Sequence, residues 1–230
     1  MTTAIHQPEH LPWYGYFHKI AHCDKFIFLD NVQFKKNYFE NRNRILTKNG
    51  SVWLTVPVQL KGHLDKKFYE MKINNDGKWK RKYLKTIIFN YSKAPFFQDI
   101  EPLLELIENT DTVNLADFNI DIIKKICNIL DIDTSKFARA SQLNVDGKST
   151  ELLIKILNKT EATKYIMGIS GFDYIDINLF KQNNIEIIEH KFEFPEYTPY
   201  NSKVLPKDKP SIIDMIVSIG KTNTIKNLNS

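Results

Sequence analysis

The densest group of side chains capable of chemistry lies close to the start of this sequence. It reads HQPEHLPWYGYFHKI from His6 to Ile20 and combines imidazoles, a carboxylate, an amide and a lysine. The imidazole of His6 could act as an acid, a base or a hydrogen-bond donor near neutral pH. His6 could equally be an ordinary histidine whose hydrogen bonds are satisfied within a strand. Its position in so polar a segment leaves both interpretations open.

A second polar group follows farther along the chain. It comprises Asp30, Gln33, Asn41, Arg42, Asn43 and Arg44. A guanidinium such as that of Arg42 can grip a phosphate or a carboxylate through two parallel hydrogen bonds. The amides of Asn41 and Asn43 can both donate and accept, which suits sugar hydroxyls or amides. The alternative is that Arg42 and Arg44 only form the solvated face of a hairpin.

The apolar pattern around these groups predicts the elements that position them. The elements are a short strand at residues 4–7, a helix at residues 13–23 and a buried strand at residues 26–29. A strand, a helix and a strand of this total length form a βαβ unit. Ligands of open α/β sheets bind beyond the carboxyl ends of the strands, and a helix start offers free N–H groups to phosphates or carboxylates. If the two strands pair in parallel, Asp30 lies near His6.

The remainder of the chain predicts a helical middle between further strands. Asn49-Gly50 is a turn signal between two apolar segments, which indicates a hairpin. Apolar residues every three to four positions predict helices at residues 79–90, 96–108 and 115–130. Further strands are expected at residues 67–73, 165–167 and 185–190, a connector at 134–140, and helices at 151–158 and 211–219, the last closed by Gly220. The fold class expected is therefore α/β, one domain over residues 1–230 with a Rossmann-like βαβ N-terminal half.

Three other features are weaker candidates for sites. His18 and His22 share a helix face at a spacing that zinc sites use, but no glutamate stands between them in the HExxH manner, so no metal is expected. Cys23 is expected to pack in the core rather than act as a nucleophile. The turn at residues 168–171 lacks the Gly-Lys-Ser/Thr of a Walker loop, although Ser170 could line a pocket.

Length and composition set the broad class of protein. With 230 residues, 42% of them apolar and 26% charged, the chain can bury one sizeable core. Two distant cysteines and the lack of a secretory signal favour a soluble protein in a reducing cytoplasm. The apolar runs are too short to span a membrane. The net charge of +5 suits an anionic ligand, but no nucleic-acid-binding motif accompanies it, so nucleic acid is not an expected partner.

Several blocks of the sequence resemble the WbqC-like protein family. The first and most specific is IHQPEHLPWYGYFHKIAHCDKFIFLDNVQF, followed by NRNRI and WLTVPV. The weaker blocks YIMGISGFDYID, LF and SIIDMI come later in the same order, so the resemblance spans nearly the whole chain. One departure is Met167 beside Gly168, where the family pattern has a small polar residue. The recurrent family residues carried over here are His6, Gln7, Trp13, Gly15, Asp30, Gln33, Asn41, Arg42 and Asn43.

The resemblance implies an enzyme of bacterial surface-polysaccharide biosynthesis, acting in O-antigen or capsule assembly. The implied reaction is acyl or aminoacyl transfer that forms an amide on a nucleotide-linked amino sugar, with an acyl thioester or ATP as co-reactant. The expected partners are the nucleotide sugar and an acyl or aminoacyl carrier protein. In that scheme His6 and Asp30 are the catalytic residues. The substrate-binding residues are Gln7, Trp13, Gln33, Asn41, Arg42, Asn43 and Ser170.

Two alternatives remain open for the same residues. The protein could be a non-catalytic subunit that binds a sugar nucleotide or a carrier protein, with His6 and Asp30 only as hydrogen-bonding groups. The layout of strand, proline-bearing loop and Gly-led helix is also similar to the start of nucleotidylyltransferase-like enzymes, which use ATP. Their second loop histidine is missing here, because Tyr16 follows Gly15. That likeness therefore concerns the fold alone.

Overall fold

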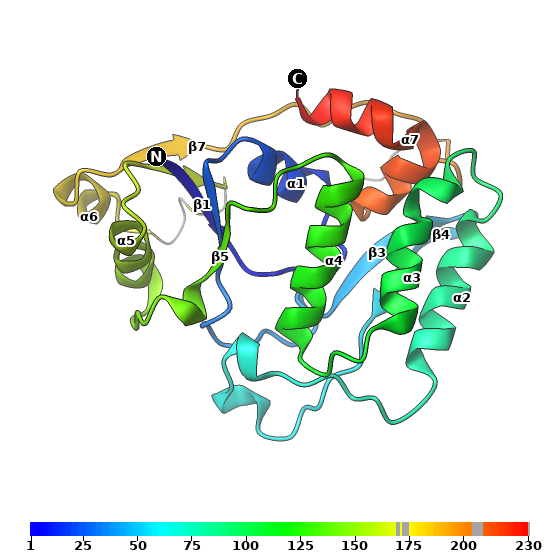
Figure 1. The fold of residues 1–230 in the computed structure, drawn as a ribbon, viewed down its shortest axis with the longest axis horizontal. Helices are drawn as coiled ribbons and strands as arrows, with labels where there is room; N and C mark the ends of the chain where they lie inside the picture. The colour runs from blue at the N-terminus through cyan, green and yellow to red at the C-terminus, as the bar shows by residue number, and fades with distance from the viewer. Residues whose placement is uncertain (169–170, 172–174, 204–208, 230) are drawn as a thin grey trace.

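A parallel five-stranded sheet forms the centre of the molecule (Figure 1). The structure is a computed structural model that describes residues 1–230 except 169–170, 172–174, 204–208 and 230. Across the sheet the strands are β5 (Phe137–Arg139), β2 (Lys25–Phe28), β1 (Thr2–His6), β6 (Lys164–Met167) and β7 (Glu186–Glu189). Each neighbouring pair is parallel, with Ile5 opposite Ile27 and Ala4 opposite Ile166. The first strand of the chain is thus the central strand of the sheet.

The strand order places a reversal of direction beside β1. Numbered along the chain, the order is third, second, first, fourth and fifth, which matches five strands of the Rossmann arrangement. The chain moves outward from β1 through β2 to β5 and then returns to the other side of β1 to form β6. Open α/β sheets bind ligands where the connections diverge in this way. The predicted α/β fold is confirmed, and α1 (Tyr14–Ala21) joins β1 to the parallel β2 as a βαβ unit.

Side chains of the sheet alternate between two apolar cores, one on each face. Ala4 and Phe26 belong to the larger core with α1, α2, α3, α4 and α7, and Ile5 and Ile27 to the smaller core with α5 and α6 (Figure 1). The helices after α1 are α2 (Trp79–Tyr91), α3 (Glu101–Asn109), α4 (Leu115–Ile129), α5 (Ser149–Lys159), α6 (Ile177–Gln182) and α7 (Ile212–Leu228). Because both faces are covered, β2 and β6 carry runs of three apolar residues, 26–28 and 165–167, in place of an alternating pattern. None of the helices in the described part of the chain is long and apolar enough to cross a membrane.

Glycines with positive φ lie at the predicted hairpin turn and at the predicted end of the last helix. The hairpin at Asn49-Gly50 is confirmed, with β3 (Arg42–Thr47) antiparallel to β4 (Gly50–Thr55). Gly50 has a φ of 105°, which residues with a Cβ rarely adopt. Gly220, with a φ of 82°, interrupts α7 where a helix end was predicted. The chain then resumes a helical course to Leu228, which the sequence pattern did not indicate.

Two short elements differ from the prediction. Residues 67–73 contain the 3-10 helix Phe68–Glu70 rather than a strand. Phe68 and Met71 are both fully buried, and three residues complete one turn of a 3-10 helix, so both side chains reach the core from one side. The expected connector at 134–140 contains the edge strand β5. A strand of three residues is too short for an apolar period to reveal it.

A buried network of polar side chains fixes the loop that follows β1. His10 Nδ1 lies 3.0 Å from Asn119 Oδ1, and His10 Nε2 lies 2.7 Å from the Tyr83 hydroxyl. The Asn119 amide nitrogen donates to the backbone carbonyls of Pro8 and Glu40, each at 2.7 Å. The Asn119 oxygen therefore accepts from His10 Nδ1, and His10 Nε2 accepts from Tyr83. This arrangement requires a neutral ring, and burial lowers the pKa of His10 to about 4.

Replacement of Asn119 tests the network. We expect Asn119→Ala to lower the free energy of unfolding by roughly 3 kcal/mol, because two buried carbonyls and the His10 N–H lose their partner. Urea unfolding followed by circular dichroism measures the change. The control is Asn158→Ala on the exposed side of α5, expected to change stability by about 0.5 kcal/mol or less. Equal effects of the two substitutions would show that the network does not hold the loop.

Candidate functional site

The carboxyl ends of β1, β6 and β7 gather titratable side chains where the strand order reverses. His6 is the last residue of β1, and His190 directly follows β7. Lys19, on α1, reaches the end of β6, since a Cβ at Gly168 would lie 3.5 Å from its Nζ. Glu9 lies in the loop between β1 and α1, near enough to Lys19 for their charges to interact. These side chains form a candidate site around the predicted residue His6.

The His6 imidazole is oriented by the backbone. Its Nδ1 lies 3.2 Å from the Gln7 carbonyl oxygen and 4.0 Å from Glu9 Oε1. The edge of Tyr16 meets the ring at 4.9 Å between centroids, and the Tyr16 hydroxyl donates to the same Gln7 carbonyl at 2.9 Å. Because a carbonyl can only accept, Nδ1 carries the proton and Nε2 keeps its lone pair. The side chain remains 28% exposed, so a ligand can reach the ring.

The surroundings of the two imidazoles at this edge keep them uncharged. Burial, and then the positive charge of Lys19, hold the pKa of His6 well below its usual value. The same two causes lower the pKa of His190 to about 3. At neutral pH the His6 ring is therefore a neutral base. A neutral imidazole in a ligand-binding edge can accept a proton from an incoming group.

Glu9 and Lys19 are both buried and lie close enough for their charges to interact. Their residues are 8% and 7% exposed. Burial raises the pKa of Glu9 to about 8 despite the attraction of Lys19. Burial likewise lowers the pKa of Lys19 to about 8 despite the attraction of Glu9. Both groups change protonation near neutral pH, as acid and base groups of active sites do.

A second buried carboxyl group, Glu40, interacts with Glu9. Glu40 is 1% exposed, and its Oε2 accepts from the Lys35 backbone N–H at 2.7 Å. Its Oε1 has no hydrogen-bond partner among the residues that the structure describes. Burial raises the pKa of Glu40 to about 7, and the charge of Glu40 raises the pKa of Glu9 further. A buried oxygen without a partner favours the protonated form of the carboxyl group.

A row of imidazoles leads from His190 along α1. His18 Nδ1 lies 3.0 Å from His190 Nε2, and the His22 ring stacks on His18 at 4.0 Å between centroids. One of the two facing nitrogens must carry a proton for this hydrogen bond to form. Burial lowers the pKa of His18 to about 4. Within the described ranges, no three histidine, cysteine or carboxylate side chains are grouped so that they could hold a metal ion.

Asp30 is buried on the side of β2 that faces β5. Its carboxylate accepts from Arg139 Nε at 2.6 Å, from the Ser141 hydroxyl at 2.8 Å and from the Ser141 N–H at 2.9 Å. These hydrogen bonds connect β2 to β5, whereas the Gln7 carbonyl orients His6. The parallel pairing of β1 with β2, which the βαβ prediction implies, is confirmed. The catalytic role of Asp30 stays a prediction.

Trp13 packs among aromatic side chains that follow β7. Its ring is parallel to that of Phe194 at 6.3 Å and tilted against that of Phe192 at 5.7 Å. Gly15 permits this packing, because a Cβ there would lie 2.6 Å from both the Trp13 and the Phe192 ring. The structure therefore gives Trp13 and Gly15 a packing function. Contact between Trp13 and a substrate stays a prediction.

Several of the other predicted binding residues are engaged with backbone groups. The amide nitrogens of Asn41, Asn43 and Gln33 donate to backbone carbonyls at 3.0, 2.7 and 2.7 Å. The Asn43 bond ends on the loop after β1 and so ties the hairpin to the candidate site. Gln7 contributes its backbone carbonyl to the site. Ser170 lies outside the described residues.

Arg42 lies flat on an aromatic ring. Its guanidinium carbon is 4.2 Å from the centroid of Trp53, and it donates to the Asn37 carbonyl. Its Nε, together with Oδ1 of Asn41, is buried without a partner in the part of the chain that is described.

Sequence reasoning missed Glu9, Lys19, Glu40 and His190 as site residues. His190 is the last residue of a predicted strand, as His6 lies near the end of the first, and this shared position was a signal that could have found it. Glu9 and Lys19 lay within the polar segment, but nothing in the sequence showed that their side chains are buried. Glu40 has no sequence signal, because only the fold brings it to Glu9.

Substitution of Glu40 tests the raised pKa of the buried carboxyl. The folded protein holds this proton more tightly than the unfolded chain, so the contribution of Glu40 to stability falls as pH rises from about 4.5 to about 7. We expect Glu40→Gln to gain about 2 kcal/mol relative to the wild type between pH 5 and pH 8, since one pKa unit equals roughly 1.4 kcal/mol. Paired urea titrations at the two pH values measure the difference. A difference that does not change with pH contradicts the assignment.

Comparisons with known proteins agree with the resemblance in the sequence. The model of the WbqC-like protein family matches residues 7–226. The chain is 35% identical over 221 residues to "Uncharacterized protein Rv1507c" of Mycobacterium tuberculosis strain H37Rv, covering 94% of this chain and 93% of that protein. No solved structure matches at a significant level. The chain belongs to the WbqC-like protein family.

Proposed function

We propose that this protein forms an amide by transferring an acyl or aminoacyl group to the amine of a nucleotide-linked amino sugar, in bacterial surface-polysaccharide biosynthesis. The observation that carries the proposal is the neutral His6 ring, whose Nε2 lone pair has no partner among the described residues, near Lys19 at the ligand-binding edge of the sheet. Acyl transfer to an amine needs a base to take the amine proton and a positive charge near the developing oxyanion. The choice of an amino-sugar acceptor rests on the resemblance to the family.

His6 is the general base of the proposed reaction. The amine nitrogen bonds to the acyl carbon while its proton passes to His6 Nε2, and the carbonyl electron pair moves to oxygen. Lys19 stabilises the negative oxygen of the tetrahedral intermediate. When the intermediate collapses, the thiolate of a thioester or the phosphate of an adenylate leaves as the amide forms. The proton on His6 then passes to the leaving group.

The two buried carboxyl groups suit an amine acceptor. An amino sugar reaches the site largely as an ammonium ion and must lose a proton before it attacks. Glu9, in the loop beside His6, changes protonation in the pH range where this exchange occurs, and the charge of the buried Glu40 helps to keep the pKa of Glu9 there. Carboxyl groups whose pKa lies near neutral pH can both take up and release such a proton.

The hairpin supplies the proposed contacts to the rest of the substrate. Arg42, whose Nε has no hydrogen-bond partner among the described residues, binds the diphosphate or an acyl carboxylate. The side-chain oxygen of Asn41, which also has no partner among them, accepts a hydrogen bond from a sugar hydroxyl. Gln33 and Asn43 act mainly by holding the loops in place, since their amides donate to backbone carbonyls. The remaining predicted substrate contacts are Gln7, Trp13 and Ser170.

The sheet order also favours a second candidate, an enzyme that uses ATP. Rossmann-type sheets bind nucleotides at the edge where the candidate site lies. An ATP-using variant of the reaction forms an acyl-adenylate first and then the same amide. A thermal-shift screen over nucleotide sugars, acyl thioesters and ATP with magnesium separates the two donors. No shift with ATP and magnesium argues against the adenylate.

Replacement of His6 tests the base. With the substrates found by the screen, we expect His6→Ala to lower kcat by a factor of about 10² to 10⁴, the usual contribution of a general base. The control is His63→Ala, in a short 3-10 helix away from the sheet edge, which should retain the wild-type rate. Wild-type turnover by His6→Ala removes the assignment of the base. Substrate binding without turnover in the presence of every donor favours the non-catalytic alternative.

A further inference from the structure

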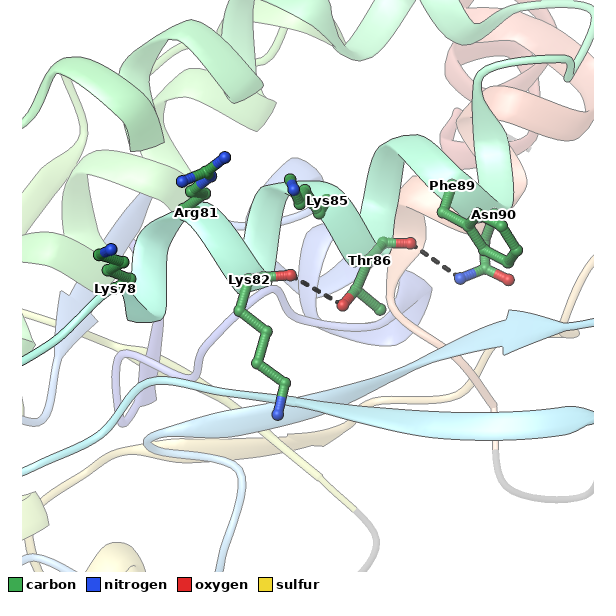
Figure 2. Close-up of a pocket in the computed structure, with 7 residues that line it drawn as sticks. All are labelled: Lys78, Arg81, Lys82, Lys85, Thr86, Phe89 and Asn90. Atoms are coloured by element: carbon green, nitrogen blue, oxygen red, sulfur yellow. Dashed lines mark hydrogen bonds between the residues drawn. The ribbon is translucent and has the colours of Figure 1, made fainter.

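The outward face of α2 carries a stripe of basic side chains that ends in an exposed phenylalanine (Figure 2). The exposed residues of this basic stripe are Lys78, Arg81, Lys82, Lys85 and Phe89. Together with Thr86 and Asn90 they line an open groove of about 480 Å³. The opposite side of the helix is buried in the larger core, where Tyr83 and Ile87 pack. The stripe therefore belongs to the surface and contributes nothing to the core.

This pattern of charge is unfavourable for α2 by itself. Lys78 and Lys82, like Arg81 and Lys85, stand four residues apart, where like charges repel on a helix. The stripe also begins at the N-terminal end of α2, where the helix dipole favours acidic side chains, and the first turn has none. Within the described residues, no carboxylate forms an ion pair with these four side chains. A partner with negative charge would relieve the repulsion.

Phe89 gives such a partner an apolar anchor. Its side chain is 87% exposed, and that of the adjacent Ile88 is 45% exposed. An aromatic ring surrounded by charged groups is typical of the residues that dominate binding between proteins. A membrane surface fits less well, because only Ile88 and Phe89 of α2 offer large exposed apolar side chains, whereas Leu84, Ile87 and Tyr91 are buried and leave little to insert.

The basic stripe lies close to the candidate site. On the inner side of α2, the Tyr83 hydroxyl lies 2.7 Å from His10 Nε2 in the loop after β1. The stripe is thus separated from that loop by one helix, whose diameter is about 10 Å. A partner on α2 would stand beside the segment that carries Glu9.

We propose that the basic stripe is the docking surface for an acidic helix of an acyl carrier protein. Carboxylates on that helix pair with Arg81, Lys82 and Lys85, and an apolar residue covers Phe89. The acidic character of the partner follows from the stripe itself. Its identity as a carrier of the acyl group rests on the proposed function.

Binding of a purified acyl carrier protein, in its phosphopantetheine form, tests the proposal. Titration calorimetry with the full chain should give saturable one-to-one binding that weakens as salt is raised. We expect the double variant Lys82→Glu, Lys85→Glu to weaken binding at least tenfold, and Phe89→Ala several-fold. The matched control is Lys148→Glu, Lys159→Glu at the two ends of α5, which changes the net charge equally and should bind as the wild type does. Circular dichroism confirms that each variant is folded.

Three outcomes would overturn the inference. They are failure of the wild type to bind the carrier protein, equal loss of binding in both double variants, and stripe-dependent binding to phosphatidylglycerol vesicles in place of the carrier protein. His6→Ala separates the two proposals, because it should bind the carrier protein normally while turnover is lost. Normal binding with wild-type turnover by that variant contradicts the proposed base and leaves the docking surface intact.

Discussion

The buried amide of Asn119 fixes both segments that bring carboxyl groups to the candidate site. Strand pairing holds the chain only as far as His6, and the loop beyond it has no sheet partner. Asn119, fully buried on α4, donates to the carbonyls of Pro8 and Glu40 and so ties this loop to the segment before β3. Glu9 follows one of these carbonyls directly, and Glu40 carries the other. Asn119 thus supports the interaction between the two carboxyl groups, together with the His10 backbone N–H, which donates to the Phe39 carbonyl at 2.8 Å, and the low dielectric of the core strengthens these hydrogen bonds.

Incomplete pairing distinguishes the buried carboxyl group of Glu40 from that of Asp30. Asp30 is completely buried, yet three hydrogen bonds and the Arg139 charge satisfy it. Glu40 is almost as deeply buried but leaves one oxygen unpaired, and desolvation is the largest cause of its raised pKa. Desolvation is also the first cause for Glu9 and Lys19. A fold that keeps the pKa values of such groups near neutral pH is less stable than one in which these groups are fully paired. Such a loss of stability is typical of functional sites.

The sequence predicted those parts of the fold that have local patterns. The βαβ unit, the hairpin at Gly50 and the helices of the middle follow from apolar periods and turn residues, which act over a few positions. Strand β5 was missed because its three residues become a strand only beside β2. The site shows the same limit. His6 was recognised from its position at the end of a strand in a polar segment, whereas Asn119 helps to bring Glu40 to Glu9 through a contact between distant parts of the chain that no local pattern records.

The two sides of α2 connect the proposed docking surface to the site. Its inner side holds His10 through Tyr83, and its outer side carries like charges that weaken the helix. A partner that neutralises those charges stabilises α2 and, through Tyr83, the position of the loop that carries Glu9. Coupling between two binding sites is reciprocal, because each ligand changes the affinity of the other by the same factor. A substrate that requires the loop in its present position would then strengthen partner binding on α2, so the donor would dock most tightly when the acceptor is already bound.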